Sequence, residues 1–410
     1  MNWVPLRGRL RGNERVIAVS ISTVLVMMGP GILAPVLPLF AREIGFGATA
    51  AGAAVGSFAL ARILFNVPLG ALSDTRGRRL LIVGGPLVVA VGMVGSGLSD
   101  TILTLIVWRF VAGLGSSMYM TGSLAYLIDI SSPTNRTRLL AVNQAALLIG
   151  VSIGPSVGGL IAAEWGLRAP FYVVAGSALI ASIYGYYRMP ETLEPLAEGA
   201  VQPRFRSKTA AGIRALGSAP FVAIALANFA FFLTRGTAQN TLLPLVAVDS
   251  FALSVDQIGL LLGGMSLMSL VLLPVASSMS DRFGRPQVIV PSLAITAVSL
   301  GVIGLSTSSP IFVFGSLLLG FASAVAGPAP AAYAAEVSSD DDRGLAMGAF
   351  RTAGDLGLLL GPPILGTVTD SSGYPLAFGI NALIVFVAAI VLAMVAFRGA
   401  GSRVWPGGKR

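Results

Sequence analysis

The 410-residue sequence contains no cysteine and no histidine, and only 11% of its residues are charged. Without cysteine the chain has no disulfide, and without both residue types it lacks the usual ligands of zinc and of iron–sulfur clusters. Acid–base chemistry by histidine is excluded as well. The sequence shows neither a nucleotide-binding loop nor a nucleophile–base pair. We therefore expect no enzyme, no ATP-driven pump, no metal site and no cofactor.

The shortage of charge accompanies a large excess of apolar residues, which make up 55% of the chain and give a mean hydropathy of +0.83. Soluble domains carry about 25% charged residues, so this composition does not suit a water-facing surface. A membrane-spanning helix needs about 20 mostly apolar residues, and such runs recur along the chain. We predict an all-α membrane protein with twelve transmembrane helices, near residues 16–40, 49–71, 80–99, 101–127, 138–162, 169–188, 219–247, 255–277, 287–306, 309–334, 344–368 and 374–397.

Basic residues are distributed unevenly between the two predicted sides of the membrane. Of the 27 Lys and Arg residues, 21 lie on the side of the termini and four within spans, while Arg42 and Arg168 lie on the opposite side. Because Lys and Arg concentrate in cytoplasmic segments, we expect a multi-pass protein of the cell membrane with both termini in the cytoplasm. The net charge of +9 then reflects topology and attraction to anionic lipid, and no nucleic-acid partner is expected.

The longest polar stretch, at 188–220, divides the predicted spans six and six. We expect an N-terminal six-helix bundle over 1–188 and a cytoplasmic linker over 189–218. A C-terminal six-helix bundle over 219–398 and a cytoplasmic tail over 399–410 follow.

The two halves are copies of one template. Adding 207 to a residue number in the first half gives the matching residue in the second, so that "SDTRGR" (73–78) matches "SDRFGR" (280–285) and "DISSPTNR" (129–136) matches "EVSSDDDR" (336–343). Six spans separate the copies, so both have the same orientation. Parallel repeats of this kind build transporters whose substrate site lies between the halves near the membrane midplane. The pattern therefore predicts two pseudo-symmetric six-helix bundles around a central site.

At these motifs the sequence resembles the major facilitator superfamily over essentially its whole length. "GALSDTRGRR" (70–79) matches the loop between the second and third helices of that family, and "GVSIGPSVGG" (150–159) is similar to the fifth-helix motif of its drug–proton antiporters. "WRFVAGLGSS" (108–117) matches the fourth-helix motif less completely. The resemblance implies the major facilitator fold and secondary transport of a small molecule, with export by antiport.

The duplicated charged phrase is expected to close the cytoplasmic side. Asp74 is predicted at the end of helix 2, near the start of helix 11 at Arg343, where a carboxylate gains ~0.3–1 kcal/mol from the helix dipole. Gly77 permits a tight turn, and Arg78 can reach Asp74 and Asp129; the resemblance implies the same clamp. The predicted gate comprises Gly70, Asp74, Gly77, Arg78, Asp129 and Arg343, with Asp281, Gly284, Arg285, Glu336 and Arg136 as its second-half counterpart. The alternative is a solvated loop that only sets topology, but acids add little to topology, so their repetition favours the gate.

The fifth predicted span has glycines at every fourth position, Gly150, Gly154 and Gly158, with Pro155 and Gly159 beside them. This spacing lets two membrane helices approach closely, and the proline is expected to kink the helix. Close packing is the main interpretation. The resemblance adds that this helix seals the interface between the halves when the protein faces inward.

Five charged residues lie at membrane depth: Arg62, Arg109, Arg235, Arg351 and Asp355. Each such group costs ~2.5–3.5 kcal/mol at mid-bilayer on insertion scales. Their equivalents at the 207-residue offset are all uncharged. The charges are therefore expected to belong to a specialised proton or substrate pathway rather than to the shared scaffold.

Asp355 is the one carboxylate predicted deep within a span, and two interpretations stay open for it. It lies four residues after Arg351, so the two can form a structural pair on one helix face. Alternatively, it carries the proton that drives transport. The resemblance implies that Arg109 takes part in proton coupling, although it could instead hold an anionic substrate or bond to backbone carbonyls. Arg62 and Arg235 could each bind a carboxylate or a phosphate.

Four deep arginines against one aspartate disfavour cationic substrates, so neutral or anionic ones are expected. The leading hypothesis is a proton-coupled exporter of small organic compounds that works by rocker-switch alternating access. An uptake symporter or facilitator for an organic anion or sugar is the second, and a non-transporting receptor or scaffold on the same fold is the third. The expected partners are a small-molecule substrate and membrane lipid, and the protein is expected to be a monomer.

Overall fold

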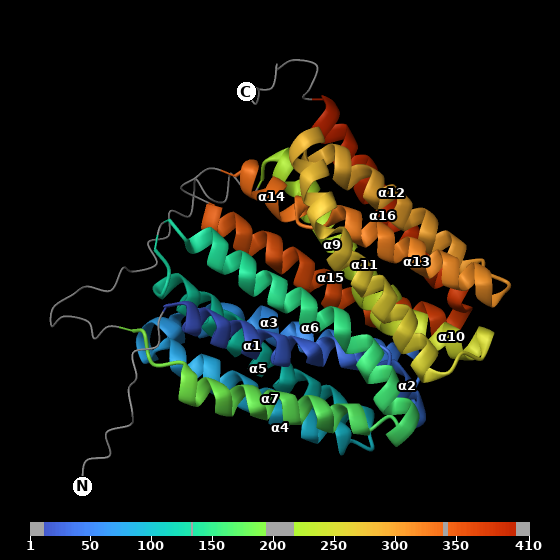
Figure 1. Cartoon of the computed structure of the whole chain (residues 1–410). Helices are drawn as coiled ribbons and strands as arrows, with labels where there is room; N and C mark the ends of the chain where they lie inside the picture. Colours follow the sequence, from blue (N-terminus) through green and yellow to red (C-terminus); the bar gives the residue numbers. More distant parts are fainter. Residues whose placement is uncertain (1–11, 133, 194–216, 339–342, 399–410) are drawn as a thin grey trace, which may run out of the picture.

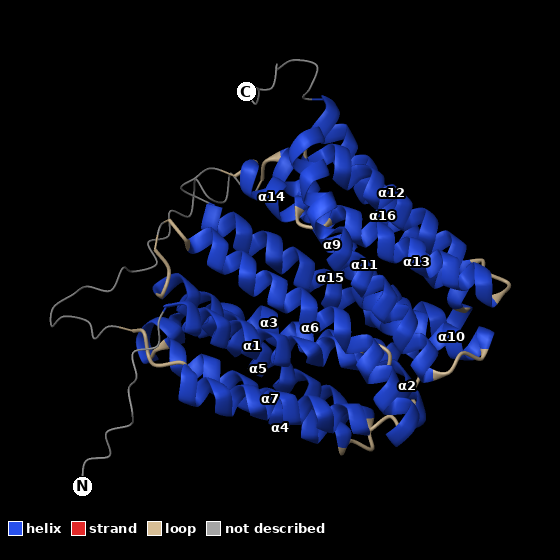
Figure 2. Cartoon of the chain, in the orientation of Figure 1, coloured by secondary structure: helices blue, strands red, loops and turns tan. Residues whose placement is uncertain are grey.

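The computed structural model describes residues 12–132, 134–193, 217–338 and 343–398. These residues are helical apart from short connections (Figure 2). Most of the predicted linker and all of the predicted tail at 399–410 lie outside the described residues. Helices are the expected outcome, because a backbone in lipid must form all its hydrogen bonds internally.

The first half of the chain contains seven helical elements among the described residues. They are α1 (Gly12–Leu33), α2 (Leu37–Glu43), α3 (Ala48–Arg76), α4 (Arg78–Gly97), α5 (Ile102–Asp129), α6 (Arg136–Trp165) and α7 (Ala169–Arg188).

The second half repeats this order with more interruptions. Its elements are α9 (Ala219–Thr234), the π-helix η1 (Arg235–Leu242), α10 (Leu243–Phe251), α11 (Val255–Phe283), α12 (Arg285–Gly304), α13 (Ser309–Ala326), α14 (Ala329–Glu336), α15 (Arg343–Ser372) and α16 (Tyr374–Arg398).

These elements account for the twelve predicted spans. Eleven helical segments of the described chain are long and apolar enough to cross a membrane. The remaining predicted span falls on α15, which is 30 residues long but carries Arg351 and Asp355 at its centre. The first, seventh and tenth spans are each interrupted, by the turn at 34–36, by η1 and by the turn at 327–328. The apolar runs predicted none of these interruptions.

The helices form two bundles that converge at one end and diverge at the other (Figure 1). We call the end where they converge, near α2 and α10, the far side. The end at which α1 begins and α16 ends is the terminal side. Between the bundles, α3 packs against α15 and α6 packs against α11.

The contacts between the bundles follow the internal repeat. A methyl group added at Gly52 of α3 would come within 2.3 Å of the carbonyl oxygen of Pro362, and one added at Gly259 of α11 within 2.7 Å of that of Pro155. Gly52 and Gly259 are equivalent positions of the two halves, as are Pro155 and Pro362. The two interfaces are therefore related by the approximate twofold symmetry that the sequence predicts.

Candidate functional site

An ion pair joins the two bundles at the centre of the interface. Arg62 of α3 and Asp355 of α15 approach to 3.2 Å between Nη2 and Oδ1, and both lie near the middle of their helices. The Asp355 side chain is 4% exposed and that of Arg62 is 32% exposed. A buried charge needs a partner to remain ionised. Arg62 of the first half is the positively charged partner of Asp355 in the second half.

One of the two interpretations of Asp355 was a structural pair with Arg351, and the structure shows Asp355 paired with Arg62 instead. Arg351 lies on the same helix but attracts Asp355 only over a longer range, whereas Arg62 makes the direct contact. In a helix the order basic-then-acidic at this spacing is the less favourable one.

Arg235 adds a third guanidinium near this ion pair. The positive charge of Arg62 repels those of both Arg235 and Arg351. We call Arg62, Arg235, Arg351 and Asp355 the central charge cluster. Its three positive groups and one negative group leave a surplus of two positive charges at mid-depth. Such a surplus favours a ligand with negative or hydrogen-bond-accepting groups.

Arg235 begins η1, an eight-residue π-helix with the sequence "RGTAQNTL". Gln239 of η1 donates to the Ser323 hydroxyl of α13 at 3.4 Å. Sequence reasoning missed this element, and the available signal was its run of polar residues within an apolar span. π-Helical turns inside α-helices occur frequently at functional sites.

Arg109 lies apart from an acidic partner. It is 6% exposed, and its Nε is 3.5 Å from the Ala54 carbonyl oxygen of α3. Its guanidinium carbon is 5.0 Å from the centre of the Phe58 ring, and its Nη1 has no hydrogen-bond partner among the described residues. Of the predicted alternatives, the structure shows the backbone contact, and a role in proton coupling stays a prediction.

On the terminal side, Arg78 holds the predicted residues of the first half together. It lies 3.0 Å from Asp74 and 3.0 Å from Asp129, and it donates to the Ser73 carbonyl oxygen at 2.6 Å. Gly77 precedes it with φ at 101°, a conformation that only glycine adopts without strain. The turn between α3 and α4 therefore presents Arg78 to both carboxylates.

The second half repeats this arrangement. Arg285 lies 2.5 Å from Asp281 and 3.0 Å from Glu336, and it donates to the Ser280 hydroxyl at 2.9 Å. Gly284 has φ at 98°. Both sets of contacts lie within one half, and their role as a gate stays a prediction.

Among the other predicted gate residues, Arg136 departs from the expectation. Arg136 donates to the Ser131 hydroxyl of its own half at 3.1 Å, and so does not complete the second-half cluster as expected. Asp74 pairs with Arg78 as expected. The bundles diverge on this side (Figure 1), and the predicted approach of Asp74 to the start of α15 stays a prediction. Gly70 lies within α3, as the predicted span places it, with open space around it, and its role in a gate stays a prediction.

Glu191, which sequence reasoning missed, binds the turn after Gly77. Its carboxylate accepts hydrogen bonds from the backbone N–H of Arg78 at 2.9 Å and of Arg79 at 3.1 Å, at the start of α4. Burial alone would raise the pKa of Glu191, but backbone donors from Leu193, these two residues and Thr192 outweigh it, so the pKa is lowered. An acidic residue beside the first turn of a helix is a usable signal. Here it could be used only with the knowledge that the end of α7 lies next to the start of α4.

The glycines of α6 pack this helix against two neighbours. Added methyl groups at Gly150 and Gly158 would approach the carbonyl oxygens of Val24 and Ile32 on α1 to 2.7 and 2.0 Å, respectively. At Gly159 the nearest atoms belong instead to α11 in the other half. The close packing expected from the spacing is present, and a sealing role at the interface stays a prediction.

A second polar cluster between the halves lies on the far side. Arg42 forms an ion pair with Asp249, and the Tyr374 hydroxyl donates to the same carboxylate at 2.5 Å. Sequence reasoning missed this cluster, although Arg42 is one of two basic residues on that side and Asp249 is its equivalent at the 207-residue offset.

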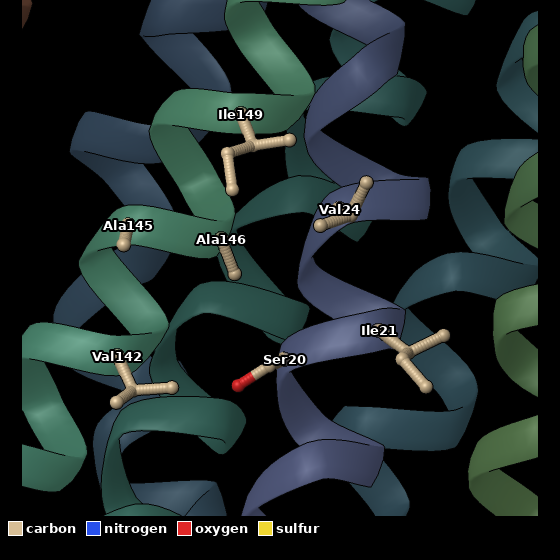
Figure 3. A pocket seen from close by; sticks show the side chains of 7 residues that line it. All are labelled: Ser20, Ile21, Val24, Val142, Ala145, Ala146 and Ile149. Carbon is tan, nitrogen blue, oxygen red and sulfur yellow. The ribbon is translucent and has the colours of Figure 1, made fainter. Parts of the chain in front are cut away.

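Two apolar hollows lie away from the central charge cluster. One lies between α1 and α6 and is lined by Ile21, Val24 and Ile149, among others (Figure 3). The other lies between α11 and α13. Neither contains a charged residue, so neither explains the deep arginines.

Comparison with known proteins places the chain among transporters. The family model of the Major Facilitator Superfamily matches residues 19–235 and again residues 224–409. An uncharacterized MFS-type transporter of Methanocaldococcus jannaschii is 24% identical over 94% of this chain and 98% of its own length. The multidrug efflux protein YfmO of Bacillus subtilis is 24% identical over 94% of each chain. The quinolone resistance protein NorA of Staphylococcus aureus is 26% identical over 42% of this chain and 44% of its own.

Solved structures share the fold. The human organic anion transporter MFSD10 matches with a TM-score of 0.66 and 21% identity, over 94% of this chain and 100% of its own. A bacterial homolog of the human lysosomal transporter Spinster matches with a TM-score of 0.80 and 14% identity, over 98% of this chain and 100% of its own. With both halves matched by the family model, the chain belongs to the Major Facilitator Superfamily of membrane transporters.

Proposed function

We propose that this transporter is a proton-coupled exporter of small organic compounds that works by rocker-switch alternating access, with its terminal side in the cytoplasm. The observation that carries the proposal is the ion pair of Asp355 and Arg62, which links the two halves at mid-depth. A proton on Asp355 removes the charge that holds Arg62. Protonation therefore loosens a contact between the bodies that must move relative to each other.

Export is supported by the names of two relatives, and antiport is supported by competition between substrate and proton for one carboxylate. YfmO and NorA are named for multidrug efflux and quinolone resistance. In antiport, substrate and proton must not bind together. A neutral substrate whose hydroxyl or amide donates to ionised Asp355 competes with the proton for one carboxylate, which satisfies that requirement.

The charge of the cluster supports neutral or anionic substrates over cationic ones. Its surplus of two positive charges repels a cation inside a medium of low dielectric constant, where charges interact more strongly than in water.

The same surplus favours a second candidate function, cotransport of an organic anion with a proton. An anion that takes Arg62 leaves Asp355 without its partner, so Asp355 then binds a proton and both ligands move together. The structural neighbour MFSD10 is described as an organic anion transporter. The two candidates thus differ in which member of the ion pair the substrate occupies.

Transport by purified protein in vesicles tests both candidates. The parent, Asp355→Asn and the control Asp256→Asn, which changes a partly exposed acid in the first turn of α11, are assayed with neutral, anionic and cationic compounds while internal pH is followed by a dye. Export predicts that neutral compounds move against protons in the parent and the control, with no gradient-driven accumulation in Asp355→Asn. Movement of anions together with protons identifies the second candidate, and normal coupling in Asp355→Asn contradicts both. Binding without any movement indicates a receptor.

A further inference from the structure

The start of α3 is completed by a residue from the other half of the molecule. Gly47 occupies the N-cap position and has no side chain to bind the free backbone N–H groups of the first turn. The carboxylate of Asp370, near the end of α15, accepts hydrogen bonds from the N–H of Ala48 at 2.8 Å and of Thr49 at 2.9 Å, and from the Thr49 hydroxyl at 2.6 Å. Four N–H groups at each helix start lack partners within the helix. Asp370 therefore caps α3 across the interface.

The equivalent helix of the second half has its own cap. Ser254, which matches Gly47 at the 207-residue offset, closes the start of α11 in a capping box with Gln257. Ser, Thr, Asp and Asn are favoured at this position for that reason. The start of α3 thus lacks a local cap, and Asp370 replaces it. The equivalent helix α11 has a local cap, so the fold does not in general require a cap from the other half.

The antiparallel register of α3 and α15 gives Asp370 a counterpart. Along the pair, Gly52 faces Pro362, Gly56 faces Leu359 and Arg62 faces Asp355. Continued to the terminal side, this register brings Asp74 opposite the start of α15 at Arg343. Each helix therefore has an aspartate near its C-terminal end that is aligned with the N-terminus of the other.

The two contacts exclude each other if the helices tilt as rigid rods. Each rod is about 44 Å long, so its ends lie about 20 Å from the central ion pair, and a tilt of about 10° moves them by about 4 Å. That distance breaks hydrogen bonds at one end while the other end closes. In this structure the far side is capped, and the Asp74 side chain is 71% exposed.

We propose that Asp370 and the first turn of α3 form a far-side clasp, a helix cap made between the halves that must break each time the transporter opens to the far side. The opposite state is the one in which the gate contact of Asp74 with the start of α15, already expected from the sequence, forms instead. The proposal rests on the alternating access proposed above. Because Gly47 has no side chain that could cap α3, the cap depends on Asp370 of the other half. The contact therefore forms or breaks as the two halves move relative to each other.

The test separates a conformational role from an ordinary helix cap. Cysteines introduced at Glu43 and Thr307, both exposed, on the far side and in different halves, carry spin labels in the otherwise cysteine-free chain, and the distance distribution reports the populations of closed and open far sides. Asp370→Ala is compared with Asp370→Ala/Gly47→Ser, which restores a local cap. Ser254→Ala, which removes a cap within one half, is the control.

We expect Asp370→Ala to lower both the melting temperature and the ratio of closed to open far sides, the ratio by about fivefold, the size typical of a lost cap. Gly47→Ser should restore the melting temperature but not the ratio, and Ser254→Ala should lower the melting temperature alone. If Asp370→Ala leaves the ratio unchanged, or if Gly47→Ser restores both quantities, the clasp is wrong. The distances are measured without substrate, so a failure of proton-coupled export in vesicles leaves this result standing.

Discussion

At the scale of single residues, the two members of the central ion pair differ in how well water can replace the partner. Asp355 is 4% exposed and Arg62 is 32% exposed. Removing one partner of a buried ion pair leaves the other charge uncompensated, at a cost of ~3–5 kcal/mol when burial is complete. Loss of Arg62 leaves Asp355 with only the more distant Arg351, whereas loss of Asp355 leaves an arginine that water reaches.

We therefore expect Arg62→Gln to lower the thermal stability of the detergent-solubilised protein more than Asp355→Asn does. The double variant should be more stable than Arg62→Gln alone, because it removes the unpaired carboxylate as well. Melting curves of the four proteins give the coupling between the residues, expected at ~0.5–3 kcal/mol. Additive effects of the two changes would mean that the pair contributes nothing as a pair.

Gly77 is the residue of the terminal-side turn that tolerates substitution least. Its φ of 101° and ψ of 158° lie in a region that is nearly confined to glycine and costs other residues ~1–3 kcal/mol. A methyl group there would also come within 2.2 Å of the Glu191 carboxylate. Gly77→Ala should therefore lower the melting temperature and displace Glu191 from α4.

Gly70→Ala is the matched control, since Gly70 is a helical glycine of the same motif with no atom near its added methyl group. Alanine is favoured over glycine inside a helix, so this variant should be as stable as the parent or slightly more so. Equal melting temperatures for Gly77→Ala and the parent would contradict the argument from backbone conformation.

At the scale of elements, local pattern was enough to predict the spans but not the contacts between them. Apolar runs predicted the twelve spans, and the offset of 207 residues predicted the repeated turn with Gly77 and Gly284. The π-helix η1 was missed because its backbone geometry depends on how the seventh span packs. The partner of Asp355 was missed because Arg62 lies in the other half, and a one-dimensional pattern shows only neighbours such as Arg351.

Two glycines of similar tightness should behave differently because they lie in different kinds of interface. Gly158 packs α6 against α1 within one half, and Gly52 packs α3 against α15 between the halves. Overfilling a packed interface costs ~1–3 kcal/mol. Gly158→Ala has no way to relieve the contact except by disturbing its bundle, whereas Gly52→Ala can relieve it by separation of the two halves on the far side.

Gly158→Ala is accordingly expected to lower the melting temperature strongly, and Gly52→Ala to raise the population with an open far side while affecting the melting temperature less. Gly379→Ala in α16, where no atom lies near the added methyl group, should change neither. Melting curves and the spin-label distances between positions 43 and 307 measure the two effects. The same outcome for Gly158→Ala and Gly52→Ala would remove the distinction between rigid bundles and a movable interface.

At the scale of the whole molecule, the scaffold is symmetric and the charges at its centre are not. Gly52 with Pro362 and Gly259 with Pro155 are equivalent contacts, so both lateral interfaces follow one plan. The central charge cluster has no such counterpart, because the positions equivalent to its members are uncharged. The symmetric contacts suit a motion in which both halves take part equally. The asymmetric charges mark the centre as the site where substrate and proton are expected.

The orientation of this scaffold in the membrane follows from the basic residues and is testable because the chain lacks cysteine. Single cysteines are placed at Asn2 and Ser402 near the two ends and at Thr307 in the turn between α12 and α13 on the far side. A membrane-impermeant maleimide added to intact cells should label the Thr307 variant. It should label the Asn2 and Ser402 variants only after the membrane is permeabilised, because Lys and Arg hold the terminal side in the cytoplasm.

Each alternative labelling pattern contradicts a different part of the argument. Labelling of positions 2 and 402 from opposite sides would mean an odd number of crossings, and the two halves would then not share one orientation. Labelling of both ends in intact cells, with position 307 protected, would keep the fold but reverse its direction. The divergent end of the bundles would then face outward, and the proposed export would have to be assigned as uptake.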